Sequence, residues 1–575
     1  MNKTEKLICL VLGAVLAWYI FVENPKKKVS SDNRGGQTLV TNEVTLSQAP
    51  SVAKTAETPK AGDAKEVKPS QPEKEYVLEN DKLKVVVSSW GAAVKKAVLK
   101  DYPRGNAPIS DENPAVEFDF SASPLAEVSG IEGFSRGTSF EFKEASSNVI
   151  VLASDAMTRK ITLADNYLLT FEDEFKEALP CANSLSLGVM EMGLGKNDLL
   201  SVDSWQIDPK GGKVIHHCEG DSPLKAYLVG SLGGCGGSKN ASGLPRTSTV
   251  GYEGSQKWIA LKNRFFVTAL VSSSDAVSGF SANISRDMKV QEYKPESIGA
   301  LAKFPSLPKN RTSVFYVGPK KQSLLWSLGM KDVMEFGMWR WVCYPILWLL
   351  DFFNSLIPNY GVAIILLTIL VRLLFWPLTH KSTVGMKKMQ EIQPKMKEIQ
   401  AKFKDNPQRL QQETWQLYRD AKVNPMSSCL PMLVQIPVFI ALFNVLRSAV
   451  ELRYAPFLWI GDLSEPEGLF SSWFPFGGLN ILPILMALTM ALQSALTPST
   501  GDKNQQRMMI VFMPVMMLFM FYSFPAALSL YWTLSQVFSI WQMWIIRRKS
   551  AAKNEAALMP EVIDPPATRQ MRRHK

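Results

Sequence analysis

The feature that most constrains this chain is an apolar stretch interrupted by a single arginine. Residues Tyr360 to Leu378 are almost entirely hydrocarbon, apart from Arg372. As a helix, these nineteen positions reach roughly 28 Å, which is about the thickness of a bilayer core. An arginine at such a position costs on the order of 2.5–3.5 kcal/mol on insertion scales. The stretch therefore predicts a transmembrane helix in which one cation faces water or polar partners.

Two interpretations of Arg372 remain open at this stage. Six apolar residues separate it from Thr379, so a snorkelling side chain would climb roughly 9 Å toward the surface. Alternatively, the guanidinium serves a function inside the membrane, which is the default interpretation of an intramembrane charge. Thr368 lies one turn earlier on the same face of the helix.

Composition excludes several classes of protein. The chain has 575 residues and a net charge of +11, and its six cysteines show no CxxC or CxxH pairing. With only four histidines, a metal centre is not expected, and no cofactor is predicted. No Walker A loop, GxSxG or GxGxxG motif occurs. A disulfide between Cys218 and Cys235 stays open.

The amino-terminal region predicts an anchor and a tether. An apolar run from Leu7 to Val22 follows two lysines and lacks a small-residue cleavage pattern, so residues 1–23 are interpreted as an uncleaved transmembrane anchor. Residues 24–75 are rich in Lys, Ser, Thr, Pro, Ala and Glu without apolar periodicity, which is typical of a disordered linker.

Residues 76–320 predict a soluble β-rich domain. Short β-branched and aromatic runs separated by Gly-rich turns indicate a large β-sandwich. The clearest strands are expected at 82–87, 148–153, 167–171, 265–271 and 313–317. The Gly-rich stretch 230–243 lacks the Lys-Ser/Thr pair and the helix start of a phosphate-binding loop, so it is interpreted as a flexible loop.

Residues 321–358 follow as an aromatic-rich segment. Aromatic residues recur between Leu324 and Leu356 and are interspersed with charges, which favours an amphipathic helix lying on the membrane interface. They include Trp326, Trp339, Trp341, Tyr344, Trp348 and Phe352. An ordinary buried helix is the alternative.

A polar segment, residues 380–427, follows the Arg372 span. Met386, Met389, Ile392, Met396 and Ile399 recur at spacings of three and four, which predicts an amphipathic helix. Asn406 and Pro407 supply an N-cap and a first-turn proline for a second helix. The two helices are expected to form a hairpin between membrane spans.

Further apolar runs complete the predicted membrane domain. They are interpreted as four more spans at 428–450, 479–497, 508–524 and 526–546, with Pro525 dividing the last two. Residues 380–427 hold ten Lys/Arg against five Asp/Glu and residues 547–575 eight against three, whereas residues 451–478 hold one against four. The positive-inside rule therefore places the hairpin and tail in the cytoplasm, and the acidic loop and the β domain outside.

Polar side chains recur within the other spans. Gln435, Asn444 and Arg447 lie in the third predicted span of the chain, counting the amino-terminal anchor, and Thr489, Gln493 and Ser494 in the fourth. Ser529, Thr533 and Gln536 lie on one face of the last. Individually they are typical of interhelical hydrogen bonds. Together with Arg372 they are also compatible with a hydrated groove, which has no acidic residue deep enough to pair permanently with the arginine.

Several motifs resemble the YidC-type membrane protein insertases of the Oxa/Alb superfamily. They include 359–372, 377–379, 389–394, 417–418, 424–425, 429–431, 435–437, 450–453, 455–457 and 459–463. The resemblance runs from about residue 320 to 550, and the β domain is similar to that of the two-membrane bacterial form. Three positions depart from the family pattern: Tyr360 replaces a Trp, Ser427-Ser428 replaces a Gly pair, and Trp532 stands where a second Tyr is frequent.

The resemblance implies a fold and a function. The fold is a polytopic α-helical membrane protein with six transmembrane helices, five of them forming the core in 359–550, a large periplasmic β-sandwich domain, a cytoplasmic helical hairpin, and a basic cytoplasmic tail, 551–575. The function is insertion and folding of nascent inner-membrane proteins, without enzymatic chemistry, through a groove containing Arg372. The expected groove residues are Arg372, Thr368, Gln435, Phe439, Gln493, Tyr531, Trp532, Thr533 and Gln536.

The resemblance also implies location and partners. The protein is expected in the bacterial inner membrane with both termini in the cytoplasm. Expected partners are nascent membrane proteins, the lipid bilayer, the Sec translocon, and the ribosome through the hairpin and tail.

Two other function classes remain open from the residues themselves. A secondary transporter would use Arg372 to bind an anion, but the spans show no inverted repeat. An enzyme or carbohydrate-binding module in residues 76–320 is the other, but no acid/base pair supports it, and a shared fold does not imply activity.

Overall fold

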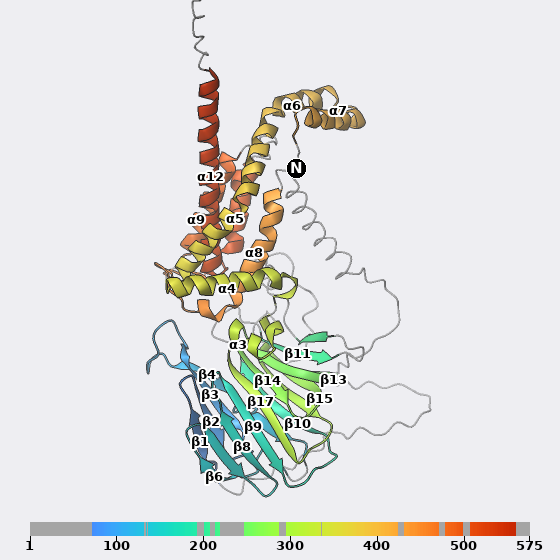
Figure 1. Cartoon of the computed structure of the whole chain (residues 1–575), viewed down its shortest axis with the longest axis vertical. Helices are drawn as coiled ribbons and strands as arrows, with labels where there is room; N and C mark the ends of the chain where they lie inside the picture. The colour runs from blue at the N-terminus through green and yellow to red at the C-terminus, as the bar shows by residue number, and fades with distance from the viewer. Residues whose placement is uncertain are drawn as a thin grey trace, which may run out of the picture.

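The computed structural model has a β domain at one end and a helical domain at the other (Figure 1). It describes residues 72–131, 134, 136–191, 200–207, 213–218, 247–286, 295–334, 336–423, 430–470, 478–497 and 507–558. The predicted anchor, the linker up to residue 71, the loop 230–243 and Cys235 lie outside these residues, as does most of the basic tail.

The β domain is built from antiparallel strands that hydrogen-bond in one continuous network of seventeen. The strands are β1 (Glu75–Glu79), β2 (Leu83–Ser88), β3 (Val94–Pro103), β4 (Ala115–Asp119), β5 (Leu125–Ser129), β6 (Glu141–Ala145), β7 (Val149–Ala153), β8 (Met157–Leu163), β9 (Leu168–Phe175), β10 (Asn183–Glu191), β11 (Ser201–Ile207), β12 (Lys213–Cys218), β13 (Thr247–Lys262), β14 (Phe266–Ser273), β15 (Val277–Arg286), β16 (Pro295–Phe304) and β17 (Asn310–Pro319). All five strands predicted from the sequence are present. Burial alternates along β2, β7 and β9, whereas the first five residues of β14 are all buried, as in a strand covered on both faces.

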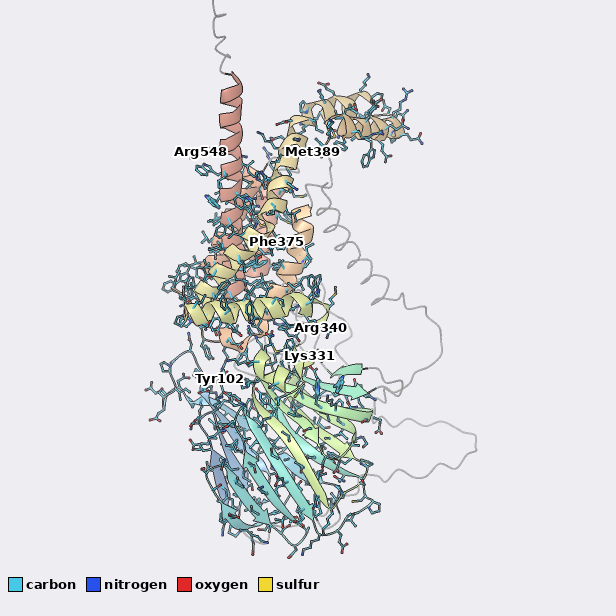
Figure 2. All side chains as sticks on the ribbon, in the orientation of Figure 1. Tyr102, Lys331, Arg340, Phe375, Met389 and Arg548 are labelled. Carbon is cyan, nitrogen blue, oxygen red and sulfur yellow. The ribbon has the colours of Figure 1, made fainter. Side chains whose placement is uncertain are left out.

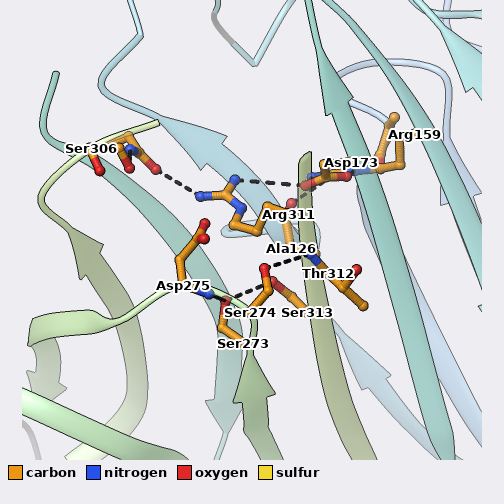
Figure 3. A network of polar contacts seen from close by, with 12 residues as sticks. Ala126, Arg159, Asp173, Ser273, Ser274, Asp275, Ser306, Arg311, Thr312 and Ser313 are labelled. Atoms are coloured by element: carbon orange, nitrogen blue, oxygen red, sulfur yellow. Dashed lines mark hydrogen bonds and ion pairs between the residues drawn. The ribbon is translucent and has the colours of Figure 1, made fainter. Parts of the chain in front are cut away.

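A charged network is buried in the β domain (Figure 3). Arg159 on β8 makes a bidentate ion pair with Asp173 on β9, at 2.6 and 2.8 Å, and Arg159 also donates to the carbonyls of Ala92 and Ala126. Arg311 on β17 lies 3.7 Å from the same carboxylate. Since all three side chains are nearly inaccessible to solvent, the strands they join depend on this pairing.

The helical domain follows directly. Its elements are α3 (Gln322–Ser327), η3 (Lys331–Met334), η4 (Gly337–Trp339), α4 (Arg340–Leu356), α5 (Tyr360–Glu391), α6 (Gln393–Lys402), α7 (Pro407–Asp420), α8 (Leu430–Ser448), η6 (Val450–Leu452), α9 (Ile481–Leu496), the π-helical turn η7 (Met508–Phe512), α11 (Met513–Phe521) and α12 (Ala526–Leu558).

The prediction of a single aromatic-rich helix over 321–358 is wrong. The structure divides this segment into α3, η3, η4 and α4. Gly329 and Gly337 adopt φ values of +69° and +50°, a left-handed conformation that interrupts a right-handed helix. The aromatic exposure remains on α4, where Trp341 and Trp348 are 57% and 61% exposed. Such side chains suit a membrane interface.

The second hairpin helix begins where the sequence predicts, but the predicted first one is divided between the end of α5 and α6. Asn406 caps α7 by accepting from the Arg409 amide at 3.1 Å, and Pro407 is the first helical residue. However, α5 continues without interruption from the apolar span to Glu391, with Pro377 inside it. Figure 2 shows Met389 close to where the hairpin leaves the bundle. The span and the base of the hairpin are therefore one helix.

The five apolar stretches expected to form the core are helical. Within the described residues, α5 alone is both long and apolar enough to qualify as a membrane span, and the stretches 435–448, 481–496 and 508–521 are shorter apolar helices. The final helix, α12, continues to Leu558 and so includes the first residues of the predicted tail.

The two domains pack directly on one another. The Tyr454 hydroxyl donates to the Arg104 carbonyl at 2.7 Å, and the Arg453 guanidinium lies over the ring of Phe266. Figure 2 places Tyr102 and Lys331 in the same region between the domains. We call residues 450–470, which supply most of these contacts, the junction segment.

Candidate functional site

Three helices position the polar residues predicted to form a site. Helix α5 packs along α4 and α12, whereas α8 packs chiefly on α4 and meets α5 and α12 only over short stretches. In Figure 1, α8 lies on the opposite side of α5 from α12. Side chains of α8 that reach α12 therefore come from a limited number of positions.

Arg372 lies near the middle of the apolar part of α5 and is half-buried. It makes no hydrogen bond or ion pair with any residue that the structure describes. Its guanidinium interacts electrostatically with the hydroxyl of Tyr531 on α12. The adjacent Leu373 and Leu374 are 61% and 69% exposed, as expected for lipid-facing residues. The cation is thus within electrostatic range of a polar hydroxyl and keeps its hydrogen-bonding capacity.

Gln435 and Tyr531 connect α8 to α12. The Gln435 Nε2 donates to the buried Tyr531 hydroxyl at 2.8 Å. Tyr531 is also within electrostatic range of Arg372, so one polar residue from each of α5, α8 and α12 lies in the same region. We call Arg372, Gln435 and Tyr531 the polar cluster.

An aromatic cluster adjoins the polar cluster. The Phe439 ring meets Trp532 edge-on with centroids 5.1 Å apart, and Phe521 lies 5.4 Å from Trp532. The indole Nε1 of Trp532 is buried and finds no hydrogen-bond acceptor among the described residues. Phe439 and Trp532 stand one turn from Gln435 and one residue from Tyr531, so apolar and polar surfaces are next to each other.

The remaining predicted residues do not join the polar cluster. Thr368 and Thr533 are buried, and their hydroxyls donate to the carbonyls of Ile364 and Ser529 in their own helices, at 2.7 and 2.8 Å. Gln536 is half-buried on α12, and Gln493 is half-buried on α9, which packs against α12 and α11. Threonine hydroxyls commonly bond the preceding turn in this way, which removes them from a polar surface.

Sequence reasoning missed one polar pair. The Gln542 amide donates to the Thr379 hydroxyl at 2.9 Å and lies 3.4 Å from the Trp376 carbonyl. Trp541 packs edge-on against Trp376 beside it. These contacts fasten α12 to α5 toward the hairpin end. The signal was a lone amide in an otherwise apolar run, which is typical of interhelical hydrogen bonding.

Acidic residues collect at the junction segment. Burial raises the pKa of Glu451, in η6, to about 7, with the neighbouring Asp351 carboxylate adding repulsion and Lys321 opposing it. Burial also raises the pKa of Asp351 on α4. Within the described part of the chain, no group of three or more His, Cys, Asp or Glu side chains is placed to hold a metal ion.

Comparison with known proteins gives matches over most of the chain. Residues 352–554 match the family model described as 60Kd inner membrane protein, and residues 239–349 match the model described as YidC periplasmic domain. The first covers α5 to most of α12, including the polar cluster, and the second covers β13 to β17 and the first part of α4. The large domain is therefore the periplasmic domain of this family.

Individual relatives match over nearly the full length or over about half of the chain. The membrane protein insertase YidC of Prosthecochloris aestuarii is 30% identical and aligned over 97% of both chains. That of Syntrophobacter fumaroxidans is 41% identical over 51% of this chain and 53% of its own. A crystal structure of an active YidC insertase covers 84% of this chain and 95% of its own, at 19% identity and a TM-score of 0.33. These relatives are named insertases rather than enzymes. The chain belongs to the YidC family of inner-membrane proteins.

Proposed function

We propose that this protein is a membrane protein insertase of the bacterial inner membrane. It carries the polar flank of a nascent membrane protein part-way across the bilayer and releases the apolar segment to lipid. The observation that carries the proposal is the polar cluster, a cation without an acidic partner among the described residues, in a bundle of apolar helices. The full-length similarity to proteins named insertases supports it.

The polar cluster and the aromatic cluster are proposed to have different roles. Arg372 attracts acidic or polar flanks, while Gln435 and Tyr531 exchange hydrogen bonds with the passing backbone. Phe439 and Trp532 contact the apolar part of the client. Thr368, Thr533, Gln493 and Gln536 are proposed to hold the surrounding helices rather than to touch the client.

The free energy comes from the client and not from a covalent reaction. Transfer of its apolar segment into lipid contributes about 0.8 kcal/mol per buried methylene. A charge pair at ~4 Å is worth about 1 kcal/mol in water and about 4 kcal/mol at an effective dielectric of 20. This is enough to draw in an anionic flank without holding it permanently.

The proposal includes an orientation and partners. The charge distribution supports cytoplasmic termini and a cytoplasmic hairpin, with the β domain and the acidic junction segment in the periplasm. Six transmembrane helices, including the amino-terminal anchor, satisfy this arrangement. We propose the ribosome as partner of the basic hairpin and tail, and the Sec translocon as a partner for larger clients.

Arg372 provides the test. In proteoliposomes, insertion is measured for paired single-span clients that differ only in the charge of the translocated flank. Arg372→Ala should slow clients with acidic flanks more than neutral ones, by roughly tenfold if about 1.4 kcal/mol is lost. Arg372→Lys keeps the charge without the planar fork and should retain much of the activity.

The control is Arg340→Ala, which removes an arginine from the exposed surface of α4. It should leave both clients at the wild-type rate. Equal behaviour of Arg372→Ala and Arg372→Lys, with no effect of flank charge, would show that the arginine has only a structural task.

A further inference from the structure

The junction segment supplies groups that complete the ends of two membrane helices. The Glu467 carboxylate accepts from the amides of Ile481 and Leu482 at 3.1 and 2.5 Å, which caps the start of α9. The carbonyls of Leu463 and Glu465 accept from the amides of Ala527 and Ala526 at 3.0 and 2.9 Å. The first amides of α12 are therefore bound by residues 463–465.

One arginine of the β domain connects this part of the junction segment to α8. Arg264 lies in the turn between β13 and β14 and is 5% exposed. Its Nε donates to the Arg447 carbonyl at 2.7 Å, its Nη1 pairs with the Glu465 carboxylate, and its Nη2 donates to the Ser464 carbonyl. A single planar guanidinium thus contacts the end of one helix and the segment that binds the start of another.

The chemistry of the contacts suits a positioning task. The Arg447 carbonyl lies in the last turn of α8, where carbonyl groups lack partners within the helix. A guanidinium has donors in a fixed fork, so satisfying three acceptors also fixes their mutual geometry. Figure 1 shows the turn between β13 and β14 directed at the helical domain.

We propose that Arg264 is a positioning residue that holds the outer ends of α8 and α12 at the spacing required for insertion. These two helices carry Gln435 with Phe439 and Tyr531 with Trp532, respectively. The inference rests on the proposed function, since it assigns to the β domain a task in shaping the surface that contacts the client. Arg264 itself lies away from the polar cluster and touches no client.

The full-length protein in lipid nanodiscs tests the local step. Hydrogen exchange is followed by mass spectrometry in peptides that contain the amides of Ala526 and Ala527. In Arg264→Ala, residues 463–465 lose a charged hydrogen-bond partner, and exchange of these amides should become about tenfold faster. The β domain should stay docked, because Tyr454 and Arg453 retain their contacts.

Three further variants sharpen the comparison. Glu465→Gln keeps both carbonyl contacts of Arg264 and should exchange nearly as wild type, whereas Arg264→Lys, with one ammonium in place of the fork, should be intermediate. The control, Arg136→Ala, removes an exposed β-domain arginine that donates to the carbonyls of Ala122 and Ser121, and should change nothing. If Arg264→Ala does not accumulate, Arg264→Lys carries the same comparison.

The functional step uses the same insertion assay as above. Arg264→Ala should reduce insertion about three- to tenfold for acidic and neutral flanks alike, since it alters spacing rather than charge. Unchanged exchange at Ala526 and Ala527, or faster exchange with wild-type insertion, overturns the inference. Arg372→Ala distinguishes this inference from the proposed function. Amide exchange at Ala526 and Ala527 in Arg372→Ala should match wild type. If Arg372→Ala does not slow clients with acidic flanks, that result counts against the proposed role of the polar cluster and not against the role of Arg264.

Discussion

Glu451 makes the stability of the junction depend on pH. The carboxyl group follows α8 in η6, and its Oε1 is buried without a hydrogen-bond partner among the described residues. Burial and the nearby Asp351 raise its pKa from 4.5 to about 7. In the unfolded chain the same group ionises near pH 4.5, so the folded protein binds one more proton between these two values.

The sign and size of the effect follow from this difference. Below pH 4.5 the group is protonated in both states and costs nothing. As the pH rises through 4.5 to 7, the unfolded state is favoured progressively, and above pH 7 the loss of stability is complete. One pKa unit corresponds to about 1.4 kcal/mol, so the full penalty is about 3 kcal/mol. Glu451→Gln removes the charge and with it this penalty.

Thermal unfolding in nanodiscs at pH 4.5 and pH 8 measures the effect. The unfolding midpoint of Glu451→Gln should match wild type at pH 4.5 and exceed it at pH 8 by several degrees, about 2–4 °C per kcal/mol. Glu398→Gln, which removes an exposed carboxylate from α6, should show no such divergence. A difference between Glu451→Gln and wild type that is the same at both pH values would refute the reasoning.

Two further substitutions test the packing. Gly361→Val places a Cβ 2.1 Å from the Phe457 ring at the start of α5, so little folded protein should survive limited proteolysis, while Val362→Ala serves as the neighbouring control. Asp173→Ala leaves Arg159 and Arg311 buried without their shared carboxylate and should destabilise the β domain by about 3–5 kcal/mol, seen as a lower unfolding midpoint. A midpoint equal to wild type would show that the buried charges are compensated elsewhere.

The secondary structure was predicted well where it depends on residues only a few positions apart in the chain. Asn406 and Pro407 mark the start of α7, because a cap and a first-turn proline act on the adjacent turn alone. The β strands were predicted from short runs of β-branched and aromatic residues between turns, which are also local signals. The breaks at Gly329 and Gly337 were missed because dense aromatic residues suggested one continuous helix. The continuation of α5 past His380 was missed because the apolar pattern ends there while the helix does not.

Contacts between residues far apart in the chain could not be predicted from the sequence. The periodicity of one helix identifies its faces but not the helix that each face meets. The family resemblance implied that Gln435 and Tyr531 line one groove, but their hydrogen bond was not predicted. The hydrogen bonds of the Thr368 and Thr533 hydroxyls to their own helices were not predicted either. No sequence pattern identified Arg264 as a contact between the domains, because its partners lie about 200 residues further along the chain.

Because α5 is uninterrupted, the orientation of the hairpin is linked to the tilt of the membrane span. Its 32 residues form a rod roughly 48 Å long, with one end at the junction segment and the other at the base of α6. Tilting this rod by about 10° about its junction end would sweep Glu391 through roughly 8 Å. Pro377 lacks the amide that would bond the Leu373 carbonyl, which gives the rod a natural place to bend. Bending there would turn the hairpin relative to the part of α5 that carries Arg372.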